Sequence, residues 1–164
     1  MGLKRSIAVW ATVVVCLAVP LVFAATSPLL QWRSPVYIMA GFAGVLAMTL
    51  LLLQPLLLLG VLPGLPPRRA RRFHVIAGGM LTGLIILHVV GLWITSAPDV
   101  VDALLFVSPT PFSAWGVVAM WAVFATAFVG FMRKAWKLSP RIWRVYHISL
   151  TIIIIGGSVV HALL

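Results

Sequence analysis

The chain has 164 residues, of which 63% are hydrophobic and only 9% are charged, and its formal net charge is +10. Several uncharged apolar runs reach the roughly 20 residues that a helix needs to span a bilayer, which predicts an all-α integral membrane protein. Its basic residues stand beside these runs, where they orient helices and contact membrane lipid, so no nucleic acid is expected as a partner. Cys16 is the single cysteine, which excludes an intramolecular disulfide.

The apolar runs predict a bundle of about five membrane-spanning helices within a single transmembrane domain, residues 1–164. The first run follows Lys4 and Arg5 as in a signal peptide, but its length of 19 residues favours a retained helix. Gln54 and Pro55 are expected to kink the second helix, because proline removes one backbone hydrogen bond. The five predicted spans cover residues 7–25, 36–62, 74–95, 114–132 and 143–164.

The lysines and arginines predict the orientation in the membrane. All twelve except Arg33 lie at the N-terminus, between the second and third runs, or between the fourth and fifth. Both acidic residues, Asp99 and Asp102, follow the third run. Because cytoplasmic loops are enriched in basic residues, the N-terminus is predicted inside and Leu164 outside a multi-pass protein of the inner or plasma membrane. The third and fifth runs then point in the same direction.

These two runs carry all four histidines of the chain. His74 and His88 are fourteen residues apart, and so are His147 and His161. Fourteen residues of helix turn through roughly 1400°, within about 40° of four full turns, and rise about 21 Å. Each pair is therefore predicted to share one helix face. The common direction of the helices pairs His74 with His147 near the inner leaflet and His88 with His161 near the outer leaflet.

Histidine inside a membrane helix is costly without a partner and therefore indicates a function. One metal ion cannot bind all four side chains, because a tetrahedral site holds its ligands about 2 Å from the metal. Two separate two-histidine zinc sites would lack further ligands. Two haems, each bound by one histidine from either helix, fit the spacing better. The alternatives are interhelical hydrogen bonding, a histidine-using proton or metal transporter without haem, and a haem-free anchor subunit.

Other side chains near the histidines have candidate roles. Arg71, Arg72 and Arg144 are candidate contacts for haem propionates, although the bias of basic residues toward the inside also explains them. Glycines leave room for a flat cofactor or allow close helix packing: Gly78, Gly79, Gly83, Gly156 and Gly157. Hydroxyl groups are candidates to orient the ligands: Thr82, Ser149, Thr151 and Ser158.

Two motifs carry a resemblance to a known family. The segment RRFH ends at His74, the segment RIWRVYH ends at His147, and each has its second histidine fourteen residues later. These motifs resemble the ferric reductase-like transmembrane domain family, in particular its bacterial members. The family is related to the haem-binding membrane domain of ferric reductases and NADPH oxidases. The resemblance, from about Val36 to Leu164, implies a bundle of usually six helices with two haem b groups, whose iron the four histidines bind as axial ligands.

The resemblance also implies a function. Electrons are expected to move from the cytoplasmic side to the outer side, toward ferric ion or a periplasmic acceptor protein, which would make the chain an oxidoreductase component. No GxGxxG fingerprint for flavin or NADPH occurs in the sequence. The electron donor is therefore expected to be a separate flavoprotein or a quinol. The nearest alternative is a quinol-linked cytochrome b subunit that serves a periplasmic reductase, because its helices can show the same histidine spacing.

A reporter fused after Leu164 tests the predicted orientation. Five spans from an N-terminus inside the cell place Leu164 outside. A reporter that functions only outside the cytoplasm should therefore be active when it is fused after Leu164. The same reporter inserted in the basic loop at residues 133–142 should be inactive. Activity of a cytoplasmic reporter after Leu164 would contradict the count of five spans.

Overall fold

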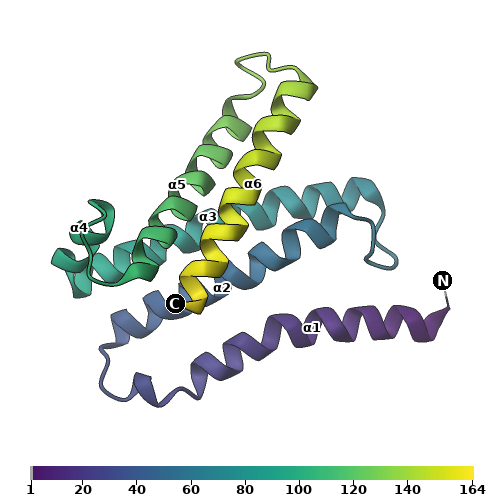
Figure 1. The fold of residues 1–164 in the computed structure, drawn as a ribbon. Helices are drawn as coiled ribbons and strands as arrows, with labels where there is room; N and C mark the ends of the chain where they lie inside the picture. The colour runs from purple at the N-terminus through teal and green to yellow at the C-terminus, as the bar shows by residue number, and fades with distance from the viewer. Residues whose placement is uncertain (1) are drawn as a thin grey trace. The chain divides into compact units, whose positions relative to one another are not determined.

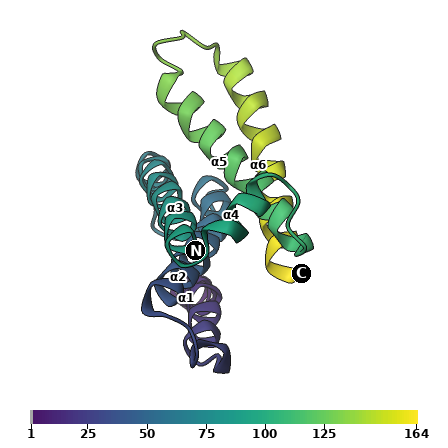
Figure 2. The same cartoon turned by 90° about the vertical axis from the view of Figure 1, so that its left-hand side faces the viewer.

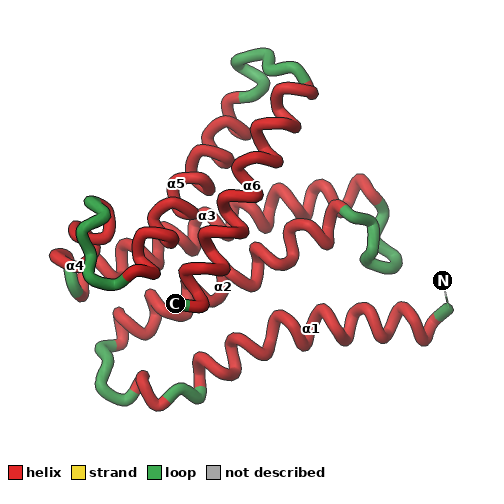
Figure 3. Tube along the Cα trace, viewed as in Figure 1, coloured by secondary structure: helices red, strands yellow, loops and turns green. Residues whose placement is uncertain are grey.

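The computed structural model describes residues 2–164, and their regular structure is entirely helical (Figure 1 and Figure 3). Five helices are long and apolar enough to cross a membrane. The predicted all-α membrane fold with about five spanning helices is therefore confirmed. The elements in chain order are α1 (Leu3–Ala25), the short 3-10 helix η1 (Pro28–Leu30), α2 (Pro35–Leu58), α3 (Pro67–Thr95), α4 (Ala97–Leu104), α5 (Pro111–Met132) and α6 (Pro140–Leu163).

The chain divides into two compact units. The first, Met1–Thr95, contains α1, α2 and α3, and the second, Ser96–Leu164, contains α4, α5 and α6. Within each unit two long helices lie side by side in opposite directions, α2 with α3 and α5 with α6 (Figure 1 and Figure 2). Each helix that carries histidines is thus packed against the helix that precedes it among the spanning helices.

The same local signature begins α2 and α6. Ser34 precedes a proline at the start of α2, and its hydroxyl accepts a hydrogen bond of 3.3 Å from the backbone N–H of Tyr37. Ser139 precedes the proline of α6 and accepts from the N–H of Ile142 at 3.3 Å. Serine caps an otherwise unpaired N–H, and proline fits the first position because its missing N–H has no partner there in any helix. These starts are therefore encoded locally.

Five boundaries differ from the predicted spans by three residues or more. α1 begins at Leu3, α5 at Pro111 and α6 at Pro140, rather than at residues 7, 114 and 143. α3 begins at Pro67 rather than at residue 74, because the arginines before the apolar run are good helix formers and extend the helix beyond its apolar part. α2 ends at Leu58 rather than at residue 62. Its end comes within one turn of Pro55 and just before Gly60, whose φ of 68° is left-handed and incompatible with a continuing helix.

The loop predicted between the third and fourth spans contains a short helix, α4. Its first turn carries Asp99, whose negative charge is favourable at a helix N-terminus, and the hydroxyl of Ser96 donates a hydrogen bond to that carboxylate. A proline also stands at the first turn. Eight residues are too few for a strong helical pattern in the sequence, so α4 was not expected.

Small residues fill the interface between α2 and α3. Ala40, Ala43 and Ala47 of α2 are buried, as are Ala77 and Gly91 of α3. A Cβ placed on Gly91 would lie 2.6 Å from the Cβ of Ala40. The missing side chain therefore permits the close approach of the two helix backbones, as is common between membrane helices.

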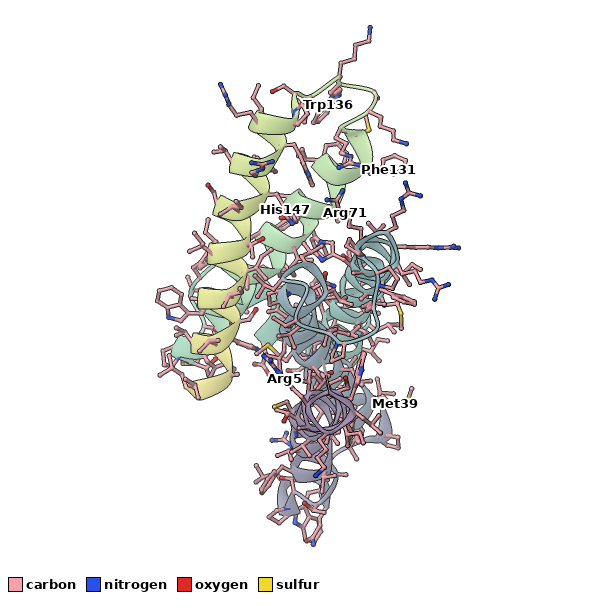
Figure 4. The ribbon with its side chains drawn as sticks, turned by 90° about the vertical axis from the view of Figure 1, so that its right-hand side faces the viewer. Arg5, Met39, Arg71, Phe131, Trp136 and His147 are labelled. Carbon is pink, nitrogen blue, oxygen red and sulfur yellow. The ribbon has the colours of Figure 1, made fainter. Side chains whose placement is uncertain are left out.

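The second unit follows the same rule. A Cβ on Gly157 of α6 would lie 3.0 Å from the carbonyl oxygen of Trp115 and 3.1 Å from the Cβ of Ala119, both on α5. Large apolar side chains instead lie on the outside, and Phe131 is 85% exposed, near the turn between α5 and α6 in Figure 4. Lipid is as apolar as these side chains, so helices in a membrane associate through close packing rather than through burial of large apolar groups.

α1 packs within the first unit. Val13 is buried in a cluster with Leu57, Leu62 and Ala77. The indole N–H of Trp10 donates a hydrogen bond of 3.2 Å to the carbonyl oxygen of Pro63. These contacts attach α1 to the end of α2 and to the loop that follows it.

Replacing Gly91 with alanine tests the close approach of α2 and α3. Because the new methyl group would overlap Ala40, we expect Gly91→Ala to lower the free energy of unfolding by about 1–3 kcal/mol, measured by chemical denaturation in detergent. Gly79→Ala on the same helix is the matched control, since a Cβ there meets no atom within 4 Å. Equal stability of the two variants would contradict the packing role of Gly91.

Candidate functional site

His88 of α3 is bound to the backbone of α2. Its Nδ1 lies 2.8 Å from the carbonyl oxygen of Ala40. A carbonyl oxygen only accepts hydrogen bonds, so Nδ1 carries the proton and donates it. The ring lies against Gly44, where a Cβ would be only 2.9 Å from Nδ1. The imidazole is thus half-buried between the two helices with its tautomer defined.

His161 of α6 is held in the same way by α5. Its Nδ1 lies 2.9 Å from the carbonyl oxygen of Phe112 and donates to it. A Cβ on Gly116 would lie 2.7 Å from that Nδ1. The ring of Phe112 also contacts the imidazole, with 5.6 Å between ring centroids and an interplanar angle of 58°.

His74 has a different neighbour, Gln54 of α2. Its Nδ1 lies 3.4 Å from the carbonyl oxygen of Gln54. The side-chain amide of Gln54 lies between His74 and Gly78. When the amide nitrogen faces Nδ1 of His74, the amide oxygen accepts a hydrogen bond of 2.9 Å from the backbone N–H of Gly78. Ala40 and Gln54 are fourteen residues apart, as are the histidines that they contact. The two histidines therefore share the face of α3 that meets α2, as predicted.

His147 of α6 stacks on an aromatic ring. Its imidazole stacks on the indole of Trp143, with 5.0 Å between centroids and an interplanar angle of 24°. The guanidinium carbon of Arg133 lies 5.6 Å from the centre of the same indole, within range of a cation–π contact. Trp143 is itself close to α5, because a Cβ on Gly130 would lie 3.3 Å from it. In Figure 4, His147 lies on α6, and Trp136 lies in the loop that precedes this helix.

The helices carry each histidine pair over the expected length. α3 contains both His74 and His88, and α6 contains both His147 and His161, without a break. The rise of about 21 Å between the members of each pair therefore follows from helix geometry. One pair belongs to each unit. The pairing of His74 with His147 and of His88 with His161 joins the two units and stays a prediction.

The other candidate residues have separate positions. Arg71 and Arg72 precede His74, and Arg144 precedes His147, by two or three residues, and all three arginines are exposed (Arg71 is labelled in Figure 4). The hydroxyls of Thr82 and Thr151 donate to carbonyl oxygens four residues earlier in their own helices, at 2.9 and 2.7 Å. Threonine commonly does so in helices, and these bonds go to the backbone rather than to a histidine ring.

The five glycines noted near the histidines differ in their surroundings. Gly157 lies at the packed interface with α5, which is the helix-packing role. Gly78 lies beside the amide of Gln54, where a Cβ would be 3.8 Å from it. At the remaining three a Cβ would meet no atom within 4 Å: Gly79, Gly83 and Gly156.

Sequence reasoning missed the partners of the histidines on α2 and α5. The sequence assigns no role to Gly44 or Gly116, and it predicts only a helix kink at Gln54 and Pro55. Gln54 is a polar side chain in an apolar run, where it needs a partner, and that signal could have identified it. The glycines had no comparable signal. Among residues 2–164 the structure gathers no group of three or more histidine, cysteine or acidic side chains around one point.

Comparison with known proteins agrees with the histidine motifs. A family model described as the ferric reductase like transmembrane component matches residues 40–158, a segment that includes His74, His88 and His147. No curated protein and no solved structure matches the chain. Since the matched segment covers well over half of the 164 residues and contains the segments RRFH and RIWRVYH, the chain belongs to the family of ferric reductase-like transmembrane components.

Proposed function

We propose that the protein transfers electrons across the membrane through two haem b groups held by histidines of α3 and α6. Membership of the ferric reductase-like family supports transmembrane electron transfer. The observation that carries the proposal to haem is the tautomer of His88 and His161. Each donates its Nδ1–H to a backbone carbonyl, which leaves the lone pair on Nε2, the usual atom through which such a histidine binds a metal.

The chemistry of these residues fits haem. Haem iron is commonly bound by neutral imidazole. A metal-bound histidine usually donates the N–H of its other ring nitrogen to an acceptor such as a backbone carbonyl oxygen. When bound, the two haems would supply one-electron Fe(III)/Fe(II) couples. The side chains of this protein would hold the macrocycles, orient the ligand rings and exclude water from them.

The four ligands would form two sites at different depths. We assign His74 and His147 to an inner haem and His88 and His161 to an outer haem, because the basic loops predict the same direction for α3 and α6. The exposed Arg71, Arg72 and Arg144 precede the inner histidines and would pair with haem propionates.

Electron flow would run from the cytoplasmic side outward. The donor would be a separate flavoprotein or a quinol, and the acceptor would be ferric ion or a periplasmic protein. Family membership supports this direction, and the asymmetric distribution of basic residues supports the orientation on which it depends.

An optical spectrum tests haem binding. Purified protein from cells supplied with haem should show a Soret band, and its dithionite-reduced form should show the sharp α-band of low-spin haem b. The pyridine haemochrome assay should give two haems per chain, because four histidines fill the axial positions of two irons. Absence of a Soret band under these conditions would exclude the proposal.

Single histidine substitutions test the pairing. His74→Ala and His147→Ala should each lower the haem content from two per chain to one, and both should lose the same haem. His88→Ala and His161→Ala should lose the other one. Potentiometric titration identifies the haem that is left by its midpoint potential. If His74→Ala and His147→Ala retained haems of different potential, the assignment by depth and the parallel direction of α3 and α6 would be wrong.

A further inference from the structure

The surroundings of His88 contain a three-part arrangement. The carbonyl oxygen of Ala40 accepts the imidazole proton, Gly44 follows on the same helix, and the histidine comes from the neighbouring helix. In an α-helix the carbonyl of one residue is directed at the N–H of the residue four positions later. An imidazole that approaches the carbonyl of Ala40 therefore passes over residue 44, where any side chain would stand in its way.

The distances show how strict this requirement is. A Cβ on Gly44 would lie 2.9 Å from Nδ1 and 3.0 Å from Cε1 of His88. Such contacts are shorter than packed atoms tolerate, so an alanine would push the ring away from the carbonyl. Gly41, one turn earlier on the same helix, has no atom within 4 Å of such a Cβ. The close contact thus belongs to one position and is not a general property of α2.

The second unit contains the same arrangement. The carbonyl of Phe112 accepts the proton of His161, and Gly116 follows four residues after the acceptor. A Cβ on Gly116 would lie 2.7 Å from Nδ1 and 2.9 Å from Cε1 of that histidine. The acceptor and the glycine of the second unit follow those of the first by 72 residues, and the histidine follows by 73 residues. The two helix pairs therefore repeat one local design.

We propose that Gly44 and Gly116 are positioning residues for the two ligands of the outer haem. This inference rests on the proposed function. Each glycine lets a ligand imidazole reach a backbone carbonyl, and that hydrogen bond fixes both the tautomer and the plane of the ring. Donation of the Nδ1 proton to a carbonyl makes Nε2 more basic, which stabilises ferric over ferrous iron and lowers the midpoint potential of the outer haem.

The inner ligands lack this design. His74 has the amide and the more distant carbonyl of Gln54 beside it, and His147 stacks on Trp143. Loss of the glycines should therefore act on one haem only.

Alanine substitutions in the purified holoprotein test this role. Gly44→Ala and Gly116→Ala should each raise the midpoint potential of the same haem, the one that His88→Ala and His161→Ala remove, and should shift the g-values of its low-spin ferric EPR signal. The other haem should keep its potential and its signal. Gly41→Ala on α2 is the matched control, because its added methyl group meets no atom within 4 Å, and it should behave as wild type.

The outcomes separate this inference from the proposed function. If the wild-type protein binds two haems and the glycine variants match wild type and Gly41→Ala in potential and EPR signal, the positioning role is refuted and haem binding stands. A shift of the inner haem by either variant would also refute it. If the wild-type protein binds no haem, the proposed function itself fails.

A measurement on the wild-type holoprotein decides the matter if Gly44→Ala and Gly116→Ala do not fold. Pulsed EPR reports the quadrupole coupling of the imidazole nitrogen remote from iron, which falls as its N–H is polarised by a hydrogen bond. The outer haem should show a lower coupling than a bis-imidazole haem free in an apolar solvent. A coupling equal to that reference would overturn the proposal.

Discussion

The hydrogen bond from an imidazole N–H to a main-chain carbonyl of the adjacent helix is the interaction on which the histidine arrangement depends. A polar group buried without a partner costs roughly 2–7 kcal/mol, and lipid offers no partner. A helical carbonyl has a second lone pair, so it can accept the imidazole without giving up its own helical bond. At His88 and His161 this bond pairs the Nδ1–H, ties two helices together and defines the tautomer of the ring.

Close helix packing makes these bonds possible. The contact of Gly91 with Ala40 and that of Gly157 with Ala119 bring the backbones of each helix pair near each other. Only at such a separation can a histidine ring span the gap to the next backbone at 2.8–2.9 Å. The large apolar side chains on the outside add little to the association of the helices, because lipid solvates them equally well. Gly91 and Gly157 therefore contribute both to helix packing and to the position of the histidines.

The two ends of the histidine-bearing helices are built differently. At the end near the arginines, a glutamine amide contacts His74 and an indole covers His147. At the other end both histidines donate to backbone carbonyls. Two chemically identical haems would thus experience different ligand surroundings. Hydrogen bonding to the ligands and local polarity are the means by which a protein separates the potentials of such groups.

The sequence by itself determined the membrane class, five spanning helices, the family and the spacing of the histidines, because hydropathy, helix periodicity and short motifs are local properties. Local signals also exist at the starts of α2 and α6, where serine and proline combine, although hydropathy alone predicts the last span only from residue 143. They misplaced the start of α3, since its arginines extend a helix that apolarity alone would shorten. The tertiary structure alone decided the partners of the histidines. Gly44 and Gly116 look like any glycine in an apolar run, and their role arises only when a histidine from the next helix packs against them.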